Sequence, residues 1–209
     1  MKSSTEIVLA IETAIVGGSI SLAENGSEIG NWIGDNSGVA KAENLLGNIH
    51  DLLAASKISQ KDIDLIAVSA GPGSFTGIRI GIATALGLKT GLGIQMASVS
   101  ALQALVHHHA DISADVFAVL PVGRNAVCIQ RFSHCIALDE PKTVSGSELL
   151  DLISGHTSAD VVVNAHLYDE LPADERIKNT GSNIARSVGL LCSMQRDVVT
   201  SPLFIAKSF

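Results

Sequence analysis

The sequence predicts an α/β protein made of two halves with the same plan, each a mixed β-sheet covered by helices. Two observations support this fold class. Segments with the periodicity of strands and of helices follow the order βββαβα in the first half, and the second half echoes that order. The strand patterns around Val8 and Val116 also occupy matching places in IVLAIETAIVGGSISL and DVFAVLPVGRNAVCIQ. Because each unit makes one mixed sheet that helices must cover, the repeat predicts two sheets.

Three strands and an amphipathic helix are expected at the start of the first half. Residues 6–14, 17–26 and 27–34 are short strand candidates, and the Asn25-Gly26 pair is a strong signal for a hairpin turn. In residues 39–56 apolar side chains recur with a period near 3.6, which predicts an amphipathic helix. The remaining elements are a strand at 63–70, a helix inside 69–89, a strand at 93–100 and a helix that ends at His107, His108 and His109.

The second half repeats this order with shorter elements. Residues 115–140 predict three strands, 145–154 a short helix, 159–165 a strand and 181–194 a helix. We expect an N-terminal subdomain of residues 1–104 and a smaller, divergent C-terminal subdomain of residues 105–209, with the last helix packing back on the first subdomain. Two such halves that face each other across a cleft are the pattern of the actin-like ATPase (ribonuclease H-like) fold.

Composition predicts a globular protein without a broad surface for nucleic acid. The 209 residues are 46% hydrophobic and 17% charged, which is ample material for a core. A formal net charge of −7 argues against direct binding to a nucleic-acid backbone. The N-terminus lacks the apolar region of a secretory signal, and the longest uncharged apolar run, 80–88, falls far short of the roughly 20 residues that cross a bilayer. We therefore expect a cytoplasmic protein with reduced cysteines and no membrane contact.

The segment SAGPGSFTGIRIGIATALGLK, residues 69–89, looks at first like a phosphate-binding loop. However, Ile78 stands where a Walker A loop needs its lysine, and the acid of a dinucleotide-binding motif is missing about 20 residues further on. What remains is a strand-to-helix turn in which Gly73 permits an unusual backbone angle and Ser74 or Thr76 caps the helix. Because a helix N-terminus also attracts anions, a capped turn and contact with a nucleotide stay as alternatives.

A phosphoryl-transfer site in this fold needs a carboxylate from each half, because Mg²⁺ takes oxygen ligands from the protein together with phosphates. The first half offers Glu12 and Thr13, but the matching loop of the second half, LPVGRNA, contains no acid. An actin-fold small-molecule kinase or ATPase is therefore an alternative with half of its site missing. We predict no catalytic residue, and we expect Glu12, Thr13, Gly73 and Ser74 to lie near any bound nucleotide.

The strand VLAIET at 8–13 and the segment at 69–89 resemble the TsaB (YeaZ) family, whose members carry an ILAIDT-like strand and a GPGSFTGxRIGxxxAxGLA segment. The resemblance implies the actin-like fold and a non-catalytic scaffold that pairs with TsaD. With a TsaE-like ATPase and a threonylcarbamoyl-adenylate synthase, this pair makes the threonylcarbamoyl modification on adenosine 37 of tRNA, so tRNA is met only through the complex. The second half departs from the family pattern, since Val122, Gly123 and Arg124 stand where relatives have DAR.

A metallopeptidase-like (glycoprotease) hydrolase is a second alternative, because TsaD-like proteins carry a pair of histidines at the start of the helix after the fifth strand. In this chain that helix begins near residue 99 without a histidine. His107, His108 and His109 lie at its far end, and consecutive positions on a helix point in different directions. We therefore predict no metal site.

The helix after the glycine-rich turn is apolar nearly all round, so we expect other parts of the protein or a partner to bury nearly every side of it. Each glycine inside it costs about 1 kcal/mol relative to alanine, which is easier to explain if another helix backbone comes close. We hypothesise that this helix and the helix at 39–56 pair with the two equivalent helices of a partner, where the resemblance also places TsaD. The predicted interface comprises Glu43, Gly47, His50, Ala54, Gly77, Ile78, Gly81, Thr84, Ala85 and Leu88.

The alternative for these helices is a solvated face at Gly47 and burial of the second helix beneath the C-terminal half. Exposed apolar helix surface would favour a homodimer when the partner is absent, since such patches seldom stay bare. We expect no tightly bound cofactor, and ATP or ADP at the partner interface stays as an open alternative.

Overall fold

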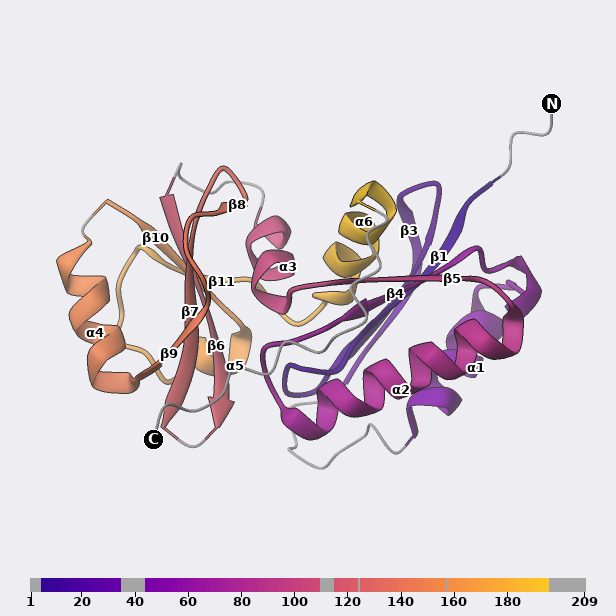
Figure 1. Cartoon of the computed structure of the whole chain (residues 1–209), viewed down its shortest axis with the longest axis horizontal. Helices are drawn as coiled ribbons and strands as arrows, with labels where there is room; N and C mark the ends of the chain where they lie inside the picture. The colour runs from indigo at the N-terminus through magenta and orange to yellow at the C-terminus, as the bar shows by residue number, and fades with distance from the viewer. Residues whose placement is uncertain (1–4, 35–43, 110–114, 124, 157, 196–209) are drawn as a thin grey trace.

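The computed structural model describes residues 5–34, 44–109, 115–123, 125–156 and 158–195. Figure 1 shows two lobes side by side, each with its own β-sheet and helices. The N-terminal lobe has a five-stranded sheet in the order β3-β2-β1-β4-β5. Its strands are β1 (Ile7–Glu12), β2 (Ser19–Glu24), β3 (Ser27–Ile33), β4 (Leu65–Ser69) and β5 (Gln95–Val99). β1 to β3 form an antiparallel meander, whereas β1, β4 and β5 are parallel, so the sheet is mixed.

Helices cover both faces of the first sheet. On one face, α1 (Leu45–Ala55) packs on β2 and β3, and α2 (Phe75–Leu92) packs on β1, β4 and β5. On the opposite face, α6 (Ala185–Gln195) packs on β1, β2 and β4. Alternate residues of β1 point to opposite faces of the sheet, and helices cover both faces. As a result, β1 is buried along its whole length. A short 3₁₀ helix, Gln60–Asp62, precedes β4.

The C-terminal lobe has a second mixed sheet in the order β11-β10-β6-β7-β8, and β9 also pairs with β7. Its strands are β6 (Asp115–Gly123), β7 (Ala126–Ser133), β8 (Ile136–Ala137), β9 (Lys142–Ser145), β10 (Asp160–Val163) and β11 (Ile177–Asn179). Helix α4 (Gly146–Gly155) lies in this lobe, and α5 (Ala165–Tyr168) follows β10 directly. The core of the lobe is centred on Phe117, Val119 and Ile129.

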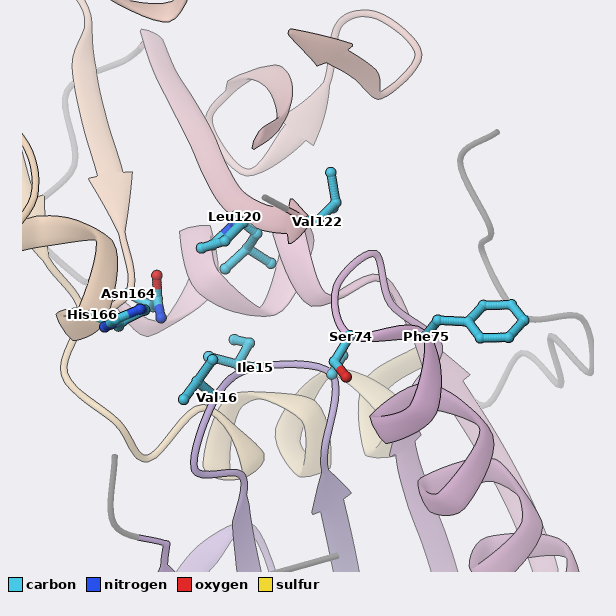
Figure 2. Close-up of a pocket in the computed structure, with 11 residues that line it drawn as sticks. Ile15, Val16, Ser74, Phe75, Leu120, Val122, Asn164 and His166 are labelled. Atoms are coloured by element: carbon cyan, nitrogen blue, oxygen red, sulfur yellow. The ribbon is translucent and has the colours of Figure 1, made fainter. Parts of the chain in front are cut away.

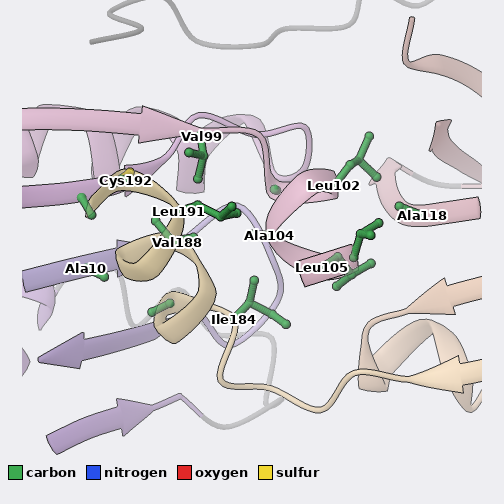
Figure 3. Close-up of a cluster of buried hydrophobic side chains, with 14 of the residues drawn as sticks. Ala10, Val99, Leu102, Ala104, Leu105, Ala118, Ile184, Val188, Leu191 and Cys192 are labelled. Atoms are coloured by element: carbon green, nitrogen blue, oxygen red, sulfur yellow. The ribbon is translucent and has the colours of Figure 1, made fainter. Parts of the chain in front are cut away.

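Helix α3 (Ala101–His108) connects the lobes, and a single apolar cluster runs through it. Figure 3 shows Leu102 and Leu105 of α3 beside Ala118 of the second sheet, with Val188 of α6 toward Ala10 of the first sheet. These residues are at most 1% exposed, and burying a leucine side chain contributes about 2 kcal/mol. The lobes are therefore joined by a shared core as well as by the chain.

The predicted fold class is confirmed: two mixed sheets follow one another in the predicted order. The sequence did not predict β9, α5 and β11, which have only 3 or 4 residues each. Elements this short carry less than one full period of a helix and little strand alternation, so a pattern search passes over them. None of the helices in the described part of the chain combines the length and hydropathy that a membrane span requires.

Candidate functional site

A pocket of about 390 Å³ lies where the two lobes meet (Figure 2). Ile15 and Val16 of the β1–β2 loop form one wall, and Leu120 and Val122 of β6 lie opposite. Ser74 and Phe75 at the start of α2 are at one end, and Asn164 and His166 are at the other. Its volume falls in the range of small-molecule sites, which lie between roughly 300 and 1,000 Å³.

The turn from β4 into α2 is held against the β1–β2 loop. The backbone N–H of Ser74 donates to the carbonyl of Ala14 at 2.7 Å, and the hydroxyl of Ser74 accepts from the N–H of Gly77 at 3.2 Å. Of the two predicted caps, Ser74 and Thr76, Ser74 is therefore the N-cap of α2. Gly73 has a φ of 150°, and a Cβ there would collide with the carbonyl of Ala14, so only glycine fits this approach.

Glu12 lies beneath the pocket rather than in its wall. Its side chain is 1% exposed, and Oε1 accepts hydrogen bonds from the N–H of Ala14 at 2.6 Å and of Ile15 at 3.0 Å. Burial raises the pKa of Glu12 to about 8, although the two amide hydrogen bonds act to lower the pKa. This carboxyl group therefore shapes the loop after β1 from inside the lobe.

The four residues predicted to lie near a nucleotide are thus neighbours in space, but they have different roles. Ser74 lines the pocket. Glu12 and Gly73 support the loops behind it, and Thr13 donates its hydroxyl to the carbonyl of Gly77 at 2.8 Å. Of the described residues that line the pocket, none is a carboxylate and only His166 can become charged.

Asn164 also lines the pocket, although the sequence did not predict it there. It follows β10 directly and is 3% exposed, and its Oδ1 has no hydrogen-bond partner among the residues that the structure describes. His166 is near it and places Nε2 3.5 Å from Oε1 of Glu170. The available signal was positional: β6 and β10 are parallel, and their carboxyl ends meet at one edge of the sheet, where ligands tend to bind.

The described residues contain no group of three His, Cys, Asp or Glu side chains placed to hold a metal ion. Nδ1 of His108 lies 3.1 Å from the hydroxyl of Ser187, and burial lowers the pKa of this histidine, with Arg186 adding to the effect. Burial also raises the pKa of the Cys128 and Cys192 thiols to about 12, so both stay protonated at neutral pH.

The predicted partner interface divides into buried and accessible residues. Gly77, Ile78, Gly81 and Ala85 are buried within the fold, which corrects their assignment to a partner surface. A Cβ at Gly77 or Gly81 would collide with Thr13, so these glycines permit a close approach of the chain's own β1–β2 loop.

The other predicted interface residues have at least part of their surface accessible. His50 and Ala54 of α1 are exposed, and Gly47, Thr84 and Leu88 are partly buried. Glu43 lies outside the described residues.

In the part of the chain that the structure describes, apolar side chains are exposed on the outer sides of α1 and α2, and we call this surface the α1–α2 face. It includes Leu46, which is 61% exposed, and Leu86, which is 40% exposed, together with His50, Ala54, Ala83 and Gly87. At the start of α2 the Arg79 guanidinium lies 3.8 Å from the centre of the Phe75 ring. The two helices cover adjoining strands of the same sheet face, α1 on β2 and β3 and α2 on β1, β4 and β5.

Comparisons with known proteins match part of the chain to proteins of tRNA threonylcarbamoyladenosine biosynthesis. Residues 38–135 match the family model described as TsaD, tRNA N6-adenosine threonylcarbamoyltransferase. The tRNA threonylcarbamoyladenosine biosynthesis protein TsaB of Escherichia coli is 36% identical over 98 residues, which is 47% of this chain and 42% of that protein. TsaB of Buchnera aphidicola subsp. Baizongia pistaciae is 36% identical over 94 residues, or 43% of this chain and 42% of that protein. The matched region thus spans less than half of these curated relatives.

Solved structures agree over nearly the whole chain. YeaZ from Pseudomonas aeruginosa has a TM-score of 0.72 and 18% sequence identity, and the match covers 96% of this chain and 100% of that one. A crystal structure of an uncharacterized protein with similarity to peptidase YeaZ, also from Pseudomonas aeruginosa, has a TM-score of 0.76 with the same identity and coverage. At this identity the likeness shows the fold.

Proposed function

Because the chain belongs to the TsaB (YeaZ) family, whose members take part in tRNA threonylcarbamoyladenosine biosynthesis, we propose that it is a non-catalytic subunit that binds a TsaD-like partner. The proposal places the contact on the α1–α2 face. The tRNA is then bound by the assembled complex, and a TsaE-like ATPase is a further partner of that complex.

The observation that carries this proposal is the uncovered apolar surface of α2. The inner side of this helix rests on its own sheet, whereas Leu86 is 40% exposed and a Cβ at Gly87 would meet nothing within 4 Å. Leu46 of α1 extends the same surface. Contiguous apolar patches on a folded protein commonly mark interaction sites.

The match to the TsaD family model supports a TsaD-like protein as the partner. That match spans residues 38–135, which include both α1 and α2. A TsaD-like protein therefore has equivalent helices, and two similar faces pair about a pseudo-twofold axis in the way that subunits of a symmetric dimer do. A homodimer through the same face is the corresponding association when the partner is absent.

The site between the lobes supports a non-catalytic role. Phosphoryl transfer needs oxygen ligands for Mg²⁺ and cations near the phosphates. The carboxyl group of Glu12 accepts hydrogen bonds from the N–H groups of Ala14 and Ile15. The residues that face it across the pocket, Leu120 and Val122, are apolar. A nucleotide at the partner interface stays a proposal, which binding of ADP to the complex but not to the separate chains would support.

Reconstitution tests the proposal directly. The TsaD-like and TsaE-like proteins and the threonylcarbamoyl-adenylate synthase of the same organism are combined with tRNA, with and without this chain, and modified adenosine is measured. We expect modification to depend on this chain and ATP turnover by the chain alone to be absent. Full modification in its absence would contradict the proposed function.

The location of the contact is tested separately with two exposed helical glycines, one on the α1–α2 face and one in the other lobe. Gly87 of α2 and Gly155 of α4 are both exposed, and a Cβ at either would meet nothing within 4 Å. Gly87→Trp places a bulky side chain on the α1–α2 face and is expected to prevent association, whereas Gly155→Trp is the matched control and is expected to bind normally. Equal binding by both folded variants would show that the contact lies elsewhere.

A further inference from the structure

We propose that a groove in the C-terminal lobe docks a segment of a partner protein in which large apolar side chains stand between lysine or arginine residues. The groove has a volume of about 510 Å³ and is bounded by the β6–β7 turn, the start of α4 and the turn that follows α5, and we call it the α4–α5 groove. Helices α4 and α5 belong to the lobe that does not carry α1 and α2 (Figure 1). The proposal therefore concerns a surface other than the α1–α2 face and does not depend on the proposed function.

The floor of the groove is apolar. Leu149 of α4, Leu167 of α5 and Val127 of β7 line it, are at most 7% exposed and belong to the core of the C-terminal lobe. Leu171 packs against the same core, and Leu150 at the rim is 41% exposed. Apolar side chains that enter the groove would leave water and cover Leu150, and the gain in free energy scales with the apolar area that is buried.

Two carboxylates lie at the groove. Glu170, after α5, lines it with a side chain that is 63% exposed, and its contact with His166 is exposed and therefore weak. On the α4 side, Ser145 lines the groove and donates its N–H and its hydroxyl to Oε2 of Glu148, at 2.7 Å and 2.8 Å. These hydrogen bonds lower the pKa of Glu148, so a carboxylate lies one hydrogen bond from the wall of the groove.

The charge at the groove indicates the kind of occupant. Of the described residues that line it, none is a lysine or an arginine. A negatively charged surface attracts a cationic segment and repels the phosphates of a nucleic acid. The formal net charge of the chain is −7, so a second copy would bring no excess of positive charge. A basic, apolar segment instead places its apolar side chains on the leucine floor and its cations beside Glu170 and Glu148.

The fold already holds the residues that would contact this segment. In the turn after α5, the N–H of Glu170 donates to the carbonyl of Leu167 at 3.1 Å, and the N–H of Leu171 donates to the carbonyl of Tyr168 at 3.4 Å. Ser145 is the N-cap of α4 and forms a capping box with Glu148. Because these groups are ordered before a partner arrives, little conformational entropy is lost when it binds.

The test is NMR titration of the isotope-labelled full-length chain with two peptides blocked at both ends, GKLFLKG and GELFLEG. We expect the basic peptide to bind with a Kd of about 1 mM or below and to shift the amide signals of Leu150, Glu170 and Leu171. The acidic peptide should bind at least about 10-fold more weakly. Binding of the basic peptide should weaken as the salt concentration rises from about 0.05 M to about 0.5 M, because salt screens exposed charges.

Two pairs of variants separate the groove from its surroundings. Glu170→Lys and Asp169→Lys make the same change of charge at adjacent exposed positions, but only Glu170 lines the groove. The first should weaken the basic peptide at least about 10-fold, and the second by less than about 3-fold. Leu150→Gln should weaken the same peptide, whereas Leu138→Gln, at a residue that is 52% exposed in the same lobe outside the groove, should not. All four positions are exposed, so the variants are expected to fold.

Several results would contradict the proposal. Absence of binding by the basic peptide at about 1 mM, equal binding of the two peptides, or equal losses in Glu170→Lys and Asp169→Lys would each overturn it. Hexylammonium chloride is the third probe, because it carries an apolar chain and a cation without a peptide backbone. If it binds as tightly as the basic peptide, the groove is a site for a small organic cation, and the proposal of a protein partner is wrong.

Discussion

The two sides of helix α2 carry the same kinds of residue and meet different surroundings. Gly77 and Gly81 on the inner side lie against Thr13 of the β1–β2 loop. Gly87 on the outer side has open space around it, and Leu86 beside it is 40% exposed. Small residues therefore serve the internal packing of this chain on one side and lie on an exposed surface on the other.

The contrast implies that changes on the inner side alter stability and that changes on the outer side alter association. Glu12 belongs to the inner side, since it shapes the same loop that α2 contacts. Its carboxyl group accepts hydrogen bonds from Ala14 and Ile15, which directly follow Thr13.

The largest effect is expected from the titration of Glu12. Because burial raises the pKa of Glu12 from 4.5 to about 8, the folded state holds its proton more tightly than the unfolded state. The stability from this group is complete below the unfolded pKa and is lost as the pH rises toward 8. At up to about 1.4 kcal/mol per pH unit, with a smaller slope near each of the two pKa values, the free energy of unfolding should fall by about 3.5 kcal/mol between pH 5 and pH 8.

Urea unfolding of the wild type and of Glu12→Gln at several pH values measures this effect. Glutamine keeps an acceptor for the two N–H groups but does not titrate, so its stability should vary much less with pH. Parallel pH profiles for the two proteins would show that Glu12 stays ionised in the folded state, and the assignment of its raised pKa would then be wrong.

Gly77→Ala is expected to destabilise the fold by about 2 kcal/mol, because overpacking a tight contact forces the backbone to move. The added Cβ would collide with the carbonyl of Thr13, and the hydrogen bond from the Thr13 hydroxyl to the carbonyl of Gly77 would be strained. Thermal and urea unfolding measure the loss. A variant as stable as the wild type would mean that the β1–β2 loop moves away from α2 at little cost.

The order of elements and the resemblance to TsaB proteins were predictable from sequence, because long periodic segments indicate the elements and the 69–89 motif carries the resemblance. The sequence did not predict which residue lies against each glycine. A glycine inside an apolar helix signals a close approach, but the signal is the same whether the approaching group belongs to the same chain or to another. Thr13 is 64 residues from Gly77 along the chain, so only the tertiary structure identifies it as the neighbour.

Asn164 escaped prediction for a related reason. An asparagine after a short strand is common at the start of a helix, and the sequence does not tell whether its side chain caps that helix. The unpaired Oδ1 and the apolar wall opposite become visible only when β6 and β10 lie side by side.

On the outer side, Leu86→Asp is expected to leave the free energy of unfolding within about 0.5 kcal/mol of the wild type. Its affinity for the TsaD-like partner should fall at least about 10-fold, or 1.4 kcal/mol, because a charge would be buried at the contact. Leu150→Asp on α4 is the matched control, since Leu150 is 41% exposed in the other lobe. Equal affinities for both variants would exclude Leu86 from the contact.

The smallest effect, Gly87→Ala, distinguishes the two sides of α2 by its sign. A Cβ at Gly87 would meet nothing within 4 Å, so the exchange should raise the free energy of unfolding by about 0.5 to 1 kcal/mol, because alanine loses less backbone entropy in a helix. The same exchange at Gly77 is expected to lower it. Melting temperatures of the two variants, recorded in one buffer, give the comparison, and a loss of stability at Gly87 would show that the outer side of α2 is packed against the chain itself.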